Sequence, residues 1–166
     1  MRQIILDTET TGLDSSLGHR IIEVAAIEVI NRRITGRNFQ RYVNPGREID
    51  EGAKKVHGLT EVFLSDKPSF GEIVVDFLKF VSGSELIIHN APFDVAFLDS
   101  ELHLCNRQEL GTYVEEIKDS LVIAKELHPG KRNSLDALCD RYRIDNSKRS
   151  LHGALLDSRL LAECYL

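Results

Sequence analysis

The sequence predicts an α/β protein in which helices pack on a mixed sheet. Two observations support this prediction: β-branched apolar segments come first in the chain, and short apolar runs alternate with helical segments after them. At 166 residues the chain is long enough for one domain with a substantial core. Parallel neighbours in such a sheet would need right-handed crossover connections.

Three strands are predicted in the first part of the chain. They occupy residues 2–6, 20–31 and 33–45, where apolar and β-branched residues dominate. The last two meet at Asn31 and Arg32, which indicates an antiparallel hairpin. A short apolar strand follows at 85–90, and a weaker segment lies around 113–117.

Helical periodicity marks the remaining elements. The segment 68–83 is the clearest, because Pro68 stands near its start, apolar residues recur at helical spacing and Gly83 follows its end. The other helices are predicted over residues 51–58, 92–105, 119–128, 134–143 and 152–166.

Composition and charge narrow the setting. No apolar segment approaches the length of a membrane span, and the first residues lack the apolar core of a signal peptide. The three cysteines are widely separated and in no metal-binding spacing, which favours a reducing cytoplasm. A net charge of −5 argues against a large electrostatic contact with nucleic acid. This charge is compatible with an enzyme that binds a few nucleotides through metal ions, because the ions reverse the local charge.

The segment LDTETTGLD, residues 6–14, sets Asp7 and Glu9 two positions apart. If the first strand runs that far, both side chains project from the same face of the sheet. Two neighbouring carboxylates repel each other, and a divalent cation such as Mg²⁺ would remove that cost. The alternative is a polar strand end that enters a turn at Gly12.

A second acidic position is Asp94, in the segment HNAPFDVAF. Pro92 is expected to open a helix, so Asp94 would lie in its first turn, where the helix dipole favours a carboxylate. The alternative is that Asp94 only caps or charges that turn.

The segment HGALLD contains His152 and Asp157, five positions apart. On one ideal helix they would be separated by about 140° and would not share a face. They converge only if His152 lies in the loop before the helix and Asp157 lies one turn inside it. Gly153, which is unfavourable inside a helix, makes that break reasonable.

In their order and spacing, DTET, HNAPFD and LHGALLD resemble the DEDDh 3′→5′ exonucleases, and the resemblance covers essentially the whole chain. The segments VHGL and PGKRNSLDALCDRYRIDNSKR resemble in particular the exonuclease domains of epsilon-type proofreading subunits of bacterial DNA polymerase III. The resemblance implies a ribonuclease H-like fold, with a mixed five-stranded sheet flanked by helices.

The resemblance also implies a catalytic site with two divalent metal ions, Mg²⁺ or Mn²⁺. Asp7, Glu9 and Asp157 match the family's direct metal ligands and also face the substrate. Asp94 matches the carboxylate that holds the second ion largely through water, and His152 matches the general base. General chemistry agrees, because two metals can neutralise the attacking and leaving oxygens of a phosphodiester, and histidine suits proton abstraction near neutral pH.

Further substrate-binding residues are implied by the same resemblance. They are Thr8 and Thr10, whose backbone would meet the terminal sugar, His57, which would approach the terminal nucleotide, and Phe93, which would offer an apolar face to a base. The sequence departs from close relatives at Gly52, where they have Glu, with Glu51 beside it, so the resemblance does not carry over a nucleotide contact from that side chain.

The implied function is proofreading: hydrolysis of the 3′-terminal phosphodiester of single-stranded or frayed DNA, with release of nucleoside 5′-monophosphates. One alternative is an RNA-trimming exonuclease of the same fold. Another is a non-catalytic adaptor that binds a polymerase, although every catalytic position is filled here.

The implied partners are a DNA 3′ end, the alpha subunit of DNA polymerase III and the theta subunit, in the bacterial cytoplasm. The chain ends in an apolar helical segment without a stop signal, LLAECYL. We therefore expect a longer protein in which a further C-terminal segment binds alpha, whereas the domain itself binds theta.

Overall fold

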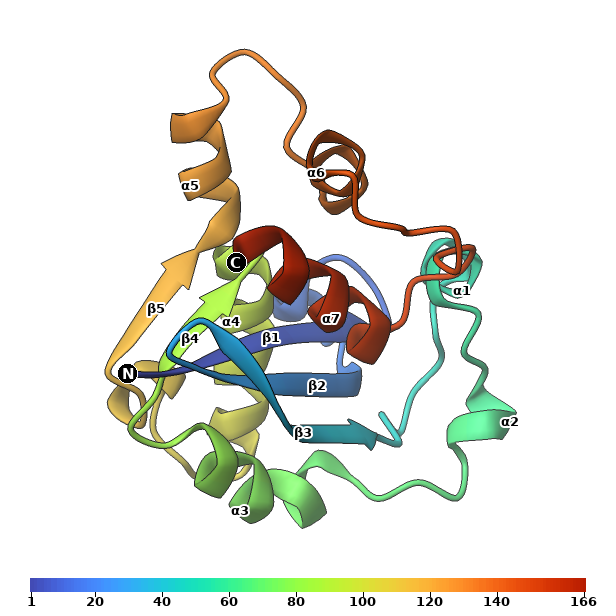
Figure 1. Ribbon diagram of the computed structural model, residues 1–166. Coiled ribbons are helices and arrows are strands. Elements are labelled where there is room, and N and C mark those ends of the chain that lie inside the picture. Colours follow the sequence, from blue (N-terminus) through green and yellow to red (C-terminus); the bar gives the residue numbers. More distant parts are fainter.

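A single mixed sheet of five strands forms the centre of the protein (Figure 1), as the computed structural model of residues 1–166 shows. The strands are β1 (Arg2–Thr10), β2 (Ile21–Ile30), β3 (Arg33–Tyr42), β4 (Glu85–Ile88) and β5 (Glu116–Asp119). Their order is β3-β2-β1-β4-β5. The pairs β1–β2 and β2–β3 are antiparallel, whereas β1–β4 and β4–β5 are parallel, which confirms the predicted mixed sheet.

The hairpin between β2 and β3 turns where it was predicted. Asn31 and Arg32 both have positive φ, 50° and 64°. Two such residues give a turn whose twist matches that of the flanking strands. The weak segment around 113–117 contributes β5, a short strand at the edge of the sheet.

The first strand is longer than predicted. We expected it to end at residue 6, but β1 continues to Thr10 because its polar part stays paired with β2. In this register Asp7 lies opposite Ala25, and Glu9 lies opposite Glu23. The condition for placing the two carboxylates on one face is therefore met.

Helices cover both faces of the sheet. They are α1 (Glu51–His57), α2 (Glu61–Leu64), α3 (Phe70–Val81), α4 (Ala91–Leu104), α5 (Ser120–Leu127), α6 (Leu135–Tyr142) and α7 (Ala154–Tyr165). All but α2 were predicted, with ends that differ by a few residues. The short α2 and two 3₁₀ turns, at Ser15–Leu17 and Leu110–Thr112, were not predicted.

Side-chain alternation along β1 divides the core into two clusters. Ile4 and Leu6 belong to the larger cluster, with residues of α3 and α4, and Ile5 belongs to the cluster with residues of α6 and α7. In Figure 1, α7 crosses the front of the sheet and α4 lies behind it. Because Asp7 and Glu9 continue the Ile5 face, their carboxylates project toward α7.

None of the helices combines the length and the apolar character that crossing a membrane would require. All three cysteines are free thiols, and only Cys139 is fully buried.

Gly12, just after β1, is expected to tolerate no side chain. A Cβ there would overlap the imidazole of His19, which is held by Thr11 Oγ1 at 2.9 Å and by Asp50 Oδ2 at 3.3 Å. Gly12→Ala should therefore lower the free energy of unfolding by about 1–3 kcal/mol, the usual cost of overpacking. Urea unfolding would measure it.

Gly111→Ala is the matched control, because its added methyl group would point into open space. This variant should stay within about 0.5 kcal/mol of the original protein. Equal stability of both variants would show that the His19 ring moves aside without cost.

Candidate active site

A cleft of about 530 Å³ lies beside the carboxyl end of β1. The residues predicted to be catalytic all line it: Asp7, Glu9, Asp94, His152 and Asp157. They come from β1, from the start of α4, and from the loop and first turn at the start of α7. Segments up to 150 positions apart in the sequence thus meet around one cavity.

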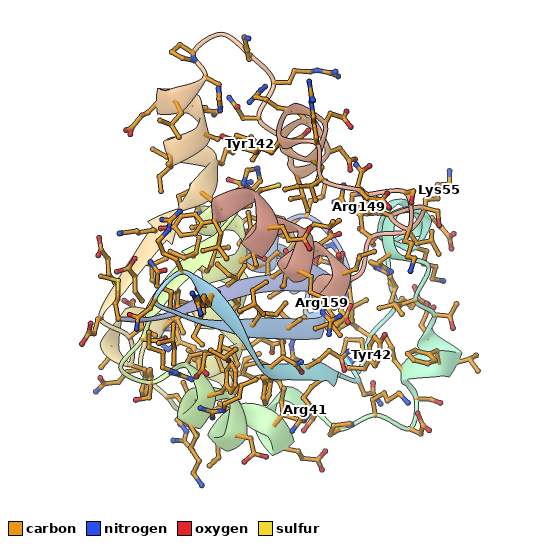
Figure 2. The ribbon with its side chains drawn as sticks, viewed as in Figure 1. Arg41, Tyr42, Lys55, Tyr142, Arg149 and Arg159 are labelled. Carbon is orange, nitrogen blue, oxygen red and sulfur yellow. The ribbon has the colours of Figure 1, made fainter.

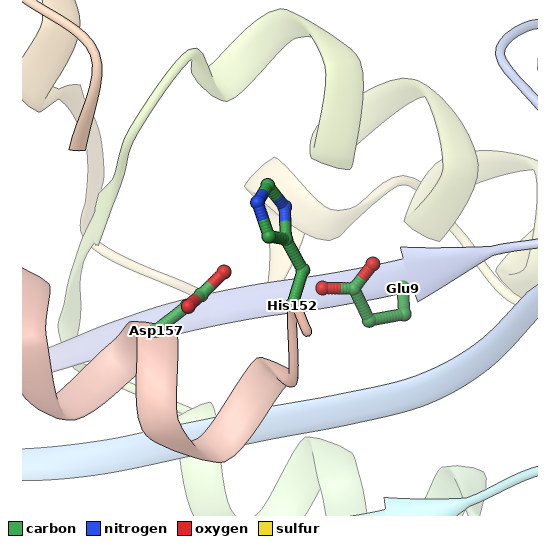
Figure 3. A group of neighbouring side chains, drawn as sticks. All are labelled: Glu9, His152 and Asp157. Atoms are coloured by element: carbon green, nitrogen blue, oxygen red, sulfur yellow. The ribbon is translucent and has the colours of Figure 1, made fainter. Parts of the chain in front are cut away.

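Glu9, His152 and Asp157 form the tightest group. One donor atom from each lies within 4.8 Å of the others, and Figure 3 shows the three side chains around one space. His152 precedes α7, with Gly153 at the N-cap, and Asp157 lies in the first turn. This confirms the predicted break that lets the two side chains converge.

Asp94 reaches the cleft from the other side of the sheet. It lies in the first turn of α4, as predicted, and is only 3% exposed. Thr8, which projects from the opposite face of β1 to Asp7, donates a hydrogen bond of 2.5 Å from Oγ1 to Asp94 Oδ1. The Thr8 side chain therefore fixes the orientation of this carboxylate.

Three carboxyl groups of the cleft, those of Asp7, Glu9 and Asp94, have raised pKa values and hold their protons unusually strongly. Burial, followed by the charges of Asp157 and other acids, raises the pKa of Glu9 to about 8. Burial also raises the pKa of Asp94 to about 7, and the hydrogen bond from Thr8 opposes this shift. Burial and the charge of Asp94 raise the pKa of Asp7 well above its usual value. A cation among these oxygens would let all of them ionise.

The donor set fits a divalent cation. Several carboxylate oxygens converge in a partly buried cleft, without a thiol, and hard oxygen ligands are those that Mg²⁺ and Mn²⁺ prefer. A histidine is close enough to join the group or to act beside it. The cleft thus has the chemistry of an acidic metal-binding site.

Glu23 is a part of the site that our sequence analysis missed. It is 3% exposed on β2, and its Oε1 accepts a hydrogen bond of 2.9 Å from the backbone N of Ala154. Because Gly153 has no side chain to cap α7, the Glu23 carboxylate accepts a hydrogen bond from the first turn of that helix in its place. The only signal in the sequence was an acidic residue inside an apolar strand.

Arg149 and His89 were also missed. Arg149 binds the carboxylate of Asp157 through two hydrogen bonds, of 2.7 and 3.0 Å. His89 lines the cleft, but its two ring nitrogens are engaged with Ser120 Oγ and with the carbonyl of Asn133. Basic residues in loops carry no local pattern that would have assigned them to the site.

A second cleft of about 400 Å³ adjoins the first. Of the predicted substrate-binding residues, Asp7 and Asp157 line only the first cleft, and the second is lined by Thr8, Glu9, Thr10, His57 and Phe93. Thr8, Glu9 and Phe93 line both cavities, so they form the wall between them. Gly52 also faces this second cleft, with open space where a side chain would stand.

His57 has a structural role in addition to its place in the wall. Its Nδ1 accepts a hydrogen bond from the backbone N of Leu59, so Nε2 carries the proton and donates it to the carbonyl of Thr10 at 3.2 Å. The ring is 5% exposed. His57 therefore ties α1 to the end of β1.

The loop that carries His152 is attached to α1. The backbone N of His152 donates to the carbonyl of Val56 at 2.7 Å. Gly58, with φ of 72°, ends α1, and a Cβ there would meet Leu151 Cδ1 at 2.6 Å. The segment VHGL thus provides the surface on which the His152 loop rests.

The strand order, the flanking helices and the acidic cleft beside the central strand together define a nuclease of the ribonuclease H-like fold. Solved structures agree. Exonuclease X in complex with 5′ overhanging duplex DNA superposes with a TM-score of 0.76 at 27% identity, over 98% of this chain and 88% of that one. Escherichia coli Exonuclease I in complex with an oligonucleotide gives 0.85 at 18% identity, over 99% of this chain and 40% of that one.

Proteins related in sequence identify the family within this fold to which the chain belongs. The profile of the family described as Exonuclease matches residues 4–165. DNA polymerase III subunit epsilon of Salmonella typhimurium is 54% identical over 99% of this chain and 70% of that protein. The subunit of the same name from Escherichia coli K12 is 53% identical over the same shares. The chain therefore belongs to the exonuclease family, among the DNA polymerase III epsilon subunits, which confirms the resemblance seen in the sequence.

The raised carboxyl pKa values predict how the stability of the metal-free protein varies with pH. At a pH between 4.5, the usual pKa of Glu, and about 8, the folded state holds a proton on Glu9 that the unfolded chain releases. The contribution of Glu9 to stability is therefore lost as pH rises through this window. Glu9→Gln should flatten the pH dependence, as measured by urea unfolding in the presence of a chelator.

Glu126→Gln serves as the control, because Glu126 is exposed on α5, away from the cleft. It should keep the pH dependence of the original protein. If Glu9→Gln gives a curve parallel to that of the control, the pKa of Glu9 is not raised by its burial and by the neighbouring acids.

Proposed function

We propose that the protein is a proofreading 3′→5′ DNA exonuclease. It would hydrolyse the terminal phosphodiester of a single-stranded or frayed 3′ end and release nucleoside 5′-monophosphates. The observation that supports this most is the convergence of Asp7, Glu9, Asp94 and Asp157 with His152 in one cleft. Membership among the epsilon subunits supports DNA as the substrate.

The same carboxylates would hold two divalent ions, Mg²⁺ or Mn²⁺. Asp7, Glu9 and Asp157 would be direct ligands, and Asp94, fixed by Thr8, would hold the second ion largely through water. When bound, the ions would neutralise charge on the attacking and leaving oxygens of the phosphodiester. With that charge supplied, the four carboxylates could all be ionised at neutral pH.

His152 would act as the general base. Its ring lies beside Glu9 and Asp157 without being enclosed, because it stands on a loop before α7. From there it would take the proton of the attacking water, as a neutral imidazole can. The hydrogen bond from its backbone to Val56 would hold the ring at the cleft during the reaction.

The second cleft would receive the terminal nucleoside. Phe93 would offer a face to the base, and the backbone around Thr8 and Thr10 would meet the sugar. The carbonyl of Thr10 already accepts from His57, so His57 would shape this wall and approach the nucleotide with its ring edge.

Partners follow from the same family membership. We infer that the protein works with the alpha and theta subunits of DNA polymerase III, in the bacterial cytoplasm. A second candidate function, trimming of RNA 3′ ends, uses the same cleft and differs only in the sugar that the second cleft accepts. No contact in that cleft favours RNA, so DNA remains the substrate that we propose.

Digestion of a 5′-labelled single strand tests the proposal. With Mg²⁺ or Mn²⁺ the label should appear on products that shorten one nucleotide at a time, because hydrolysis begins at the 3′ end. Mononucleotides should accumulate, and a chelator should stop the reaction. Asp7→Asn, which removes a proposed ligand, serves as the inactive control.

A matched RNA strand in the same assay separates the alternatives. Faster digestion of RNA would favour the trimming enzyme. Absence of hydrolysis by the folded protein, with metal present, would favour a non-catalytic adaptor.

The role of His152 is tested by His152→Ala. Turnover should fall by about 10²–10⁴-fold, the usual contribution of a general base. Binding of Mn²⁺, measured by calorimetry, should survive, because His152 is proposed to act on water and not on the metal.

His103→Ala is the control, since His103 is exposed on α4. It should leave turnover unchanged. Normal turnover in His152→Ala would remove His152 from the mechanism.

A further inference from the structure

Arg149, in the loop between α6 and α7, is bound on both sides by carboxylates. Its Nε and Nη2 donate to the two oxygens of Asp157, at 2.7 and 3.0 Å, and its Nη1 lies 2.8 Å from Asp136 Oδ2. The side chain is 8% exposed. Such a fork on a carboxylate is among the stronger hydrogen-bonded pairs in proteins. We call Asp136, Arg149 and Asp157 the Arg149 bridge.

The position of the Arg149 bridge is significant because Asp157 is also a proposed ligand of the metal ion. Both of its oxygens accept from Arg149, so a metal ion that binds either oxygen would lie close to the guanidinium and compete with its positive charge. Arg149 is also the one side chain lining the cleft that carries a permanent positive charge.

We propose that Arg149 is an internal cation that competes with a divalent metal ion for Asp157, so that loading of the site requires the guanidinium to leave this carboxylate. This inference rests on the proposed function, because it assumes that Asp157 is a metal ligand. Arg149 acts through Asp157 and is therefore a positioning residue.

Asp136 is the reason that Arg149 can leave Asp157 without becoming unpaired. It lies in the first turn of α6, with its side chain 55% exposed, and holds Nη1 independently of the fork. The guanidinium would thus remain on Asp136 while Asp157 turns to the metal. The loop stays attached to α6, and His152 stays near the cleft.

His152 is also affected when the Arg149 guanidinium leaves Asp157. Its Nδ1 lies 3.4 Å from Arg149 Nη2, and a guanidinium can only donate, so this nitrogen is the acceptor. In the bridged arrangement the lone pair of Nδ1 is therefore directed at Arg149. Departure of Arg149 would release the Asp157 oxygens and this lone pair together, so metal binding would prepare the base at the same time.

Binding of Mn²⁺ alone, without DNA, tests the inference by calorimetry. Arg149→Gln should bind Mn²⁺ about tenfold more tightly than the original protein, which corresponds to one charge-assisted hydrogen bond that no longer competes. Arg149→Lys keeps the charge but not the fork, so its affinity should lie between the two. A purely structural defect would weaken metal binding and could not tighten it.

Arg159→Gln is the matched control. Arg159, labelled with Arg149 in Figure 2, is exposed on α7 and lines a different cavity, beside Ile34 and Asn38 of β3. The same charge is therefore lost without loss of the bridge. Its affinity for Mn²⁺ should stay within about twofold, because exposed charges interact weakly with a site.

Thermal unfolding gives a second readout. In the presence of a chelator, Arg149→Gln should melt below the original protein, because Asp157 loses its counter-charge, and Mn²⁺ should raise its melting temperature by a larger amount. If Arg149→Gln and Arg149→Lys are folded and bind Mn²⁺ no more tightly than the original protein, the inference is wrong. If all variants still digest DNA in that case, the proposed function stands. If no variant binds Mn²⁺, both fail.

Discussion

The register between β1 and β2 is the constraint on which the cleft depends. Pairing as far as Thr10 keeps a polar segment in strand conformation, so that Asp7 and Glu9 project toward α7 and Thr8 projects toward α4. A slip of one residue would turn the two carboxylates into the α3–α4 core and Thr8 into the cleft. Ile4, Ile5 and Leu6, all fully buried, anchor this strand between the two core clusters.

Repulsion among the carboxylates is reduced by different hydrogen-bond donors at different carboxylates. Thr8 binds Asp94, Gln40 and the N-terminus of α7 bind Glu23, and Arg149 binds Asp157. Asp7 and Glu9 are left with the fewest compensating contacts, and burial together with the neighbouring acids raises their pKa values. Positive charge is therefore lacking at the centre of the cleft, and a metal ion bound there would provide it.

His152, the proposed general base, is held by parts of the chain that do not belong to the central sheet. Its loop rests on α1 through Val56 and Gly58, and the Arg149 bridge connects it to α6. His57 joins α1 to the end of β1, so the same helix supports the loop and the second cleft. Metal binding, proton abstraction and nucleotide binding would therefore be linked through a few contacts around α1.

The sequence by itself determined the features that depend on near neighbours. The turn at Asn31 and Arg32, the start of α4 at Pro92 and the break before α7 at Gly153 follow from local conformational preferences. The candidate catalytic residues were identified because DTET, HNAPFD and LHGALLD occur in the same order as in the DEDDh exonucleases. Only the tertiary structure decided that β1 reaches Thr10, that Glu23 caps a helix 131 positions away and that Arg149 occupies Asp157. These depend on strand pairing and on side chains that meet across the fold, and such contacts leave no periodic or local signal in the sequence.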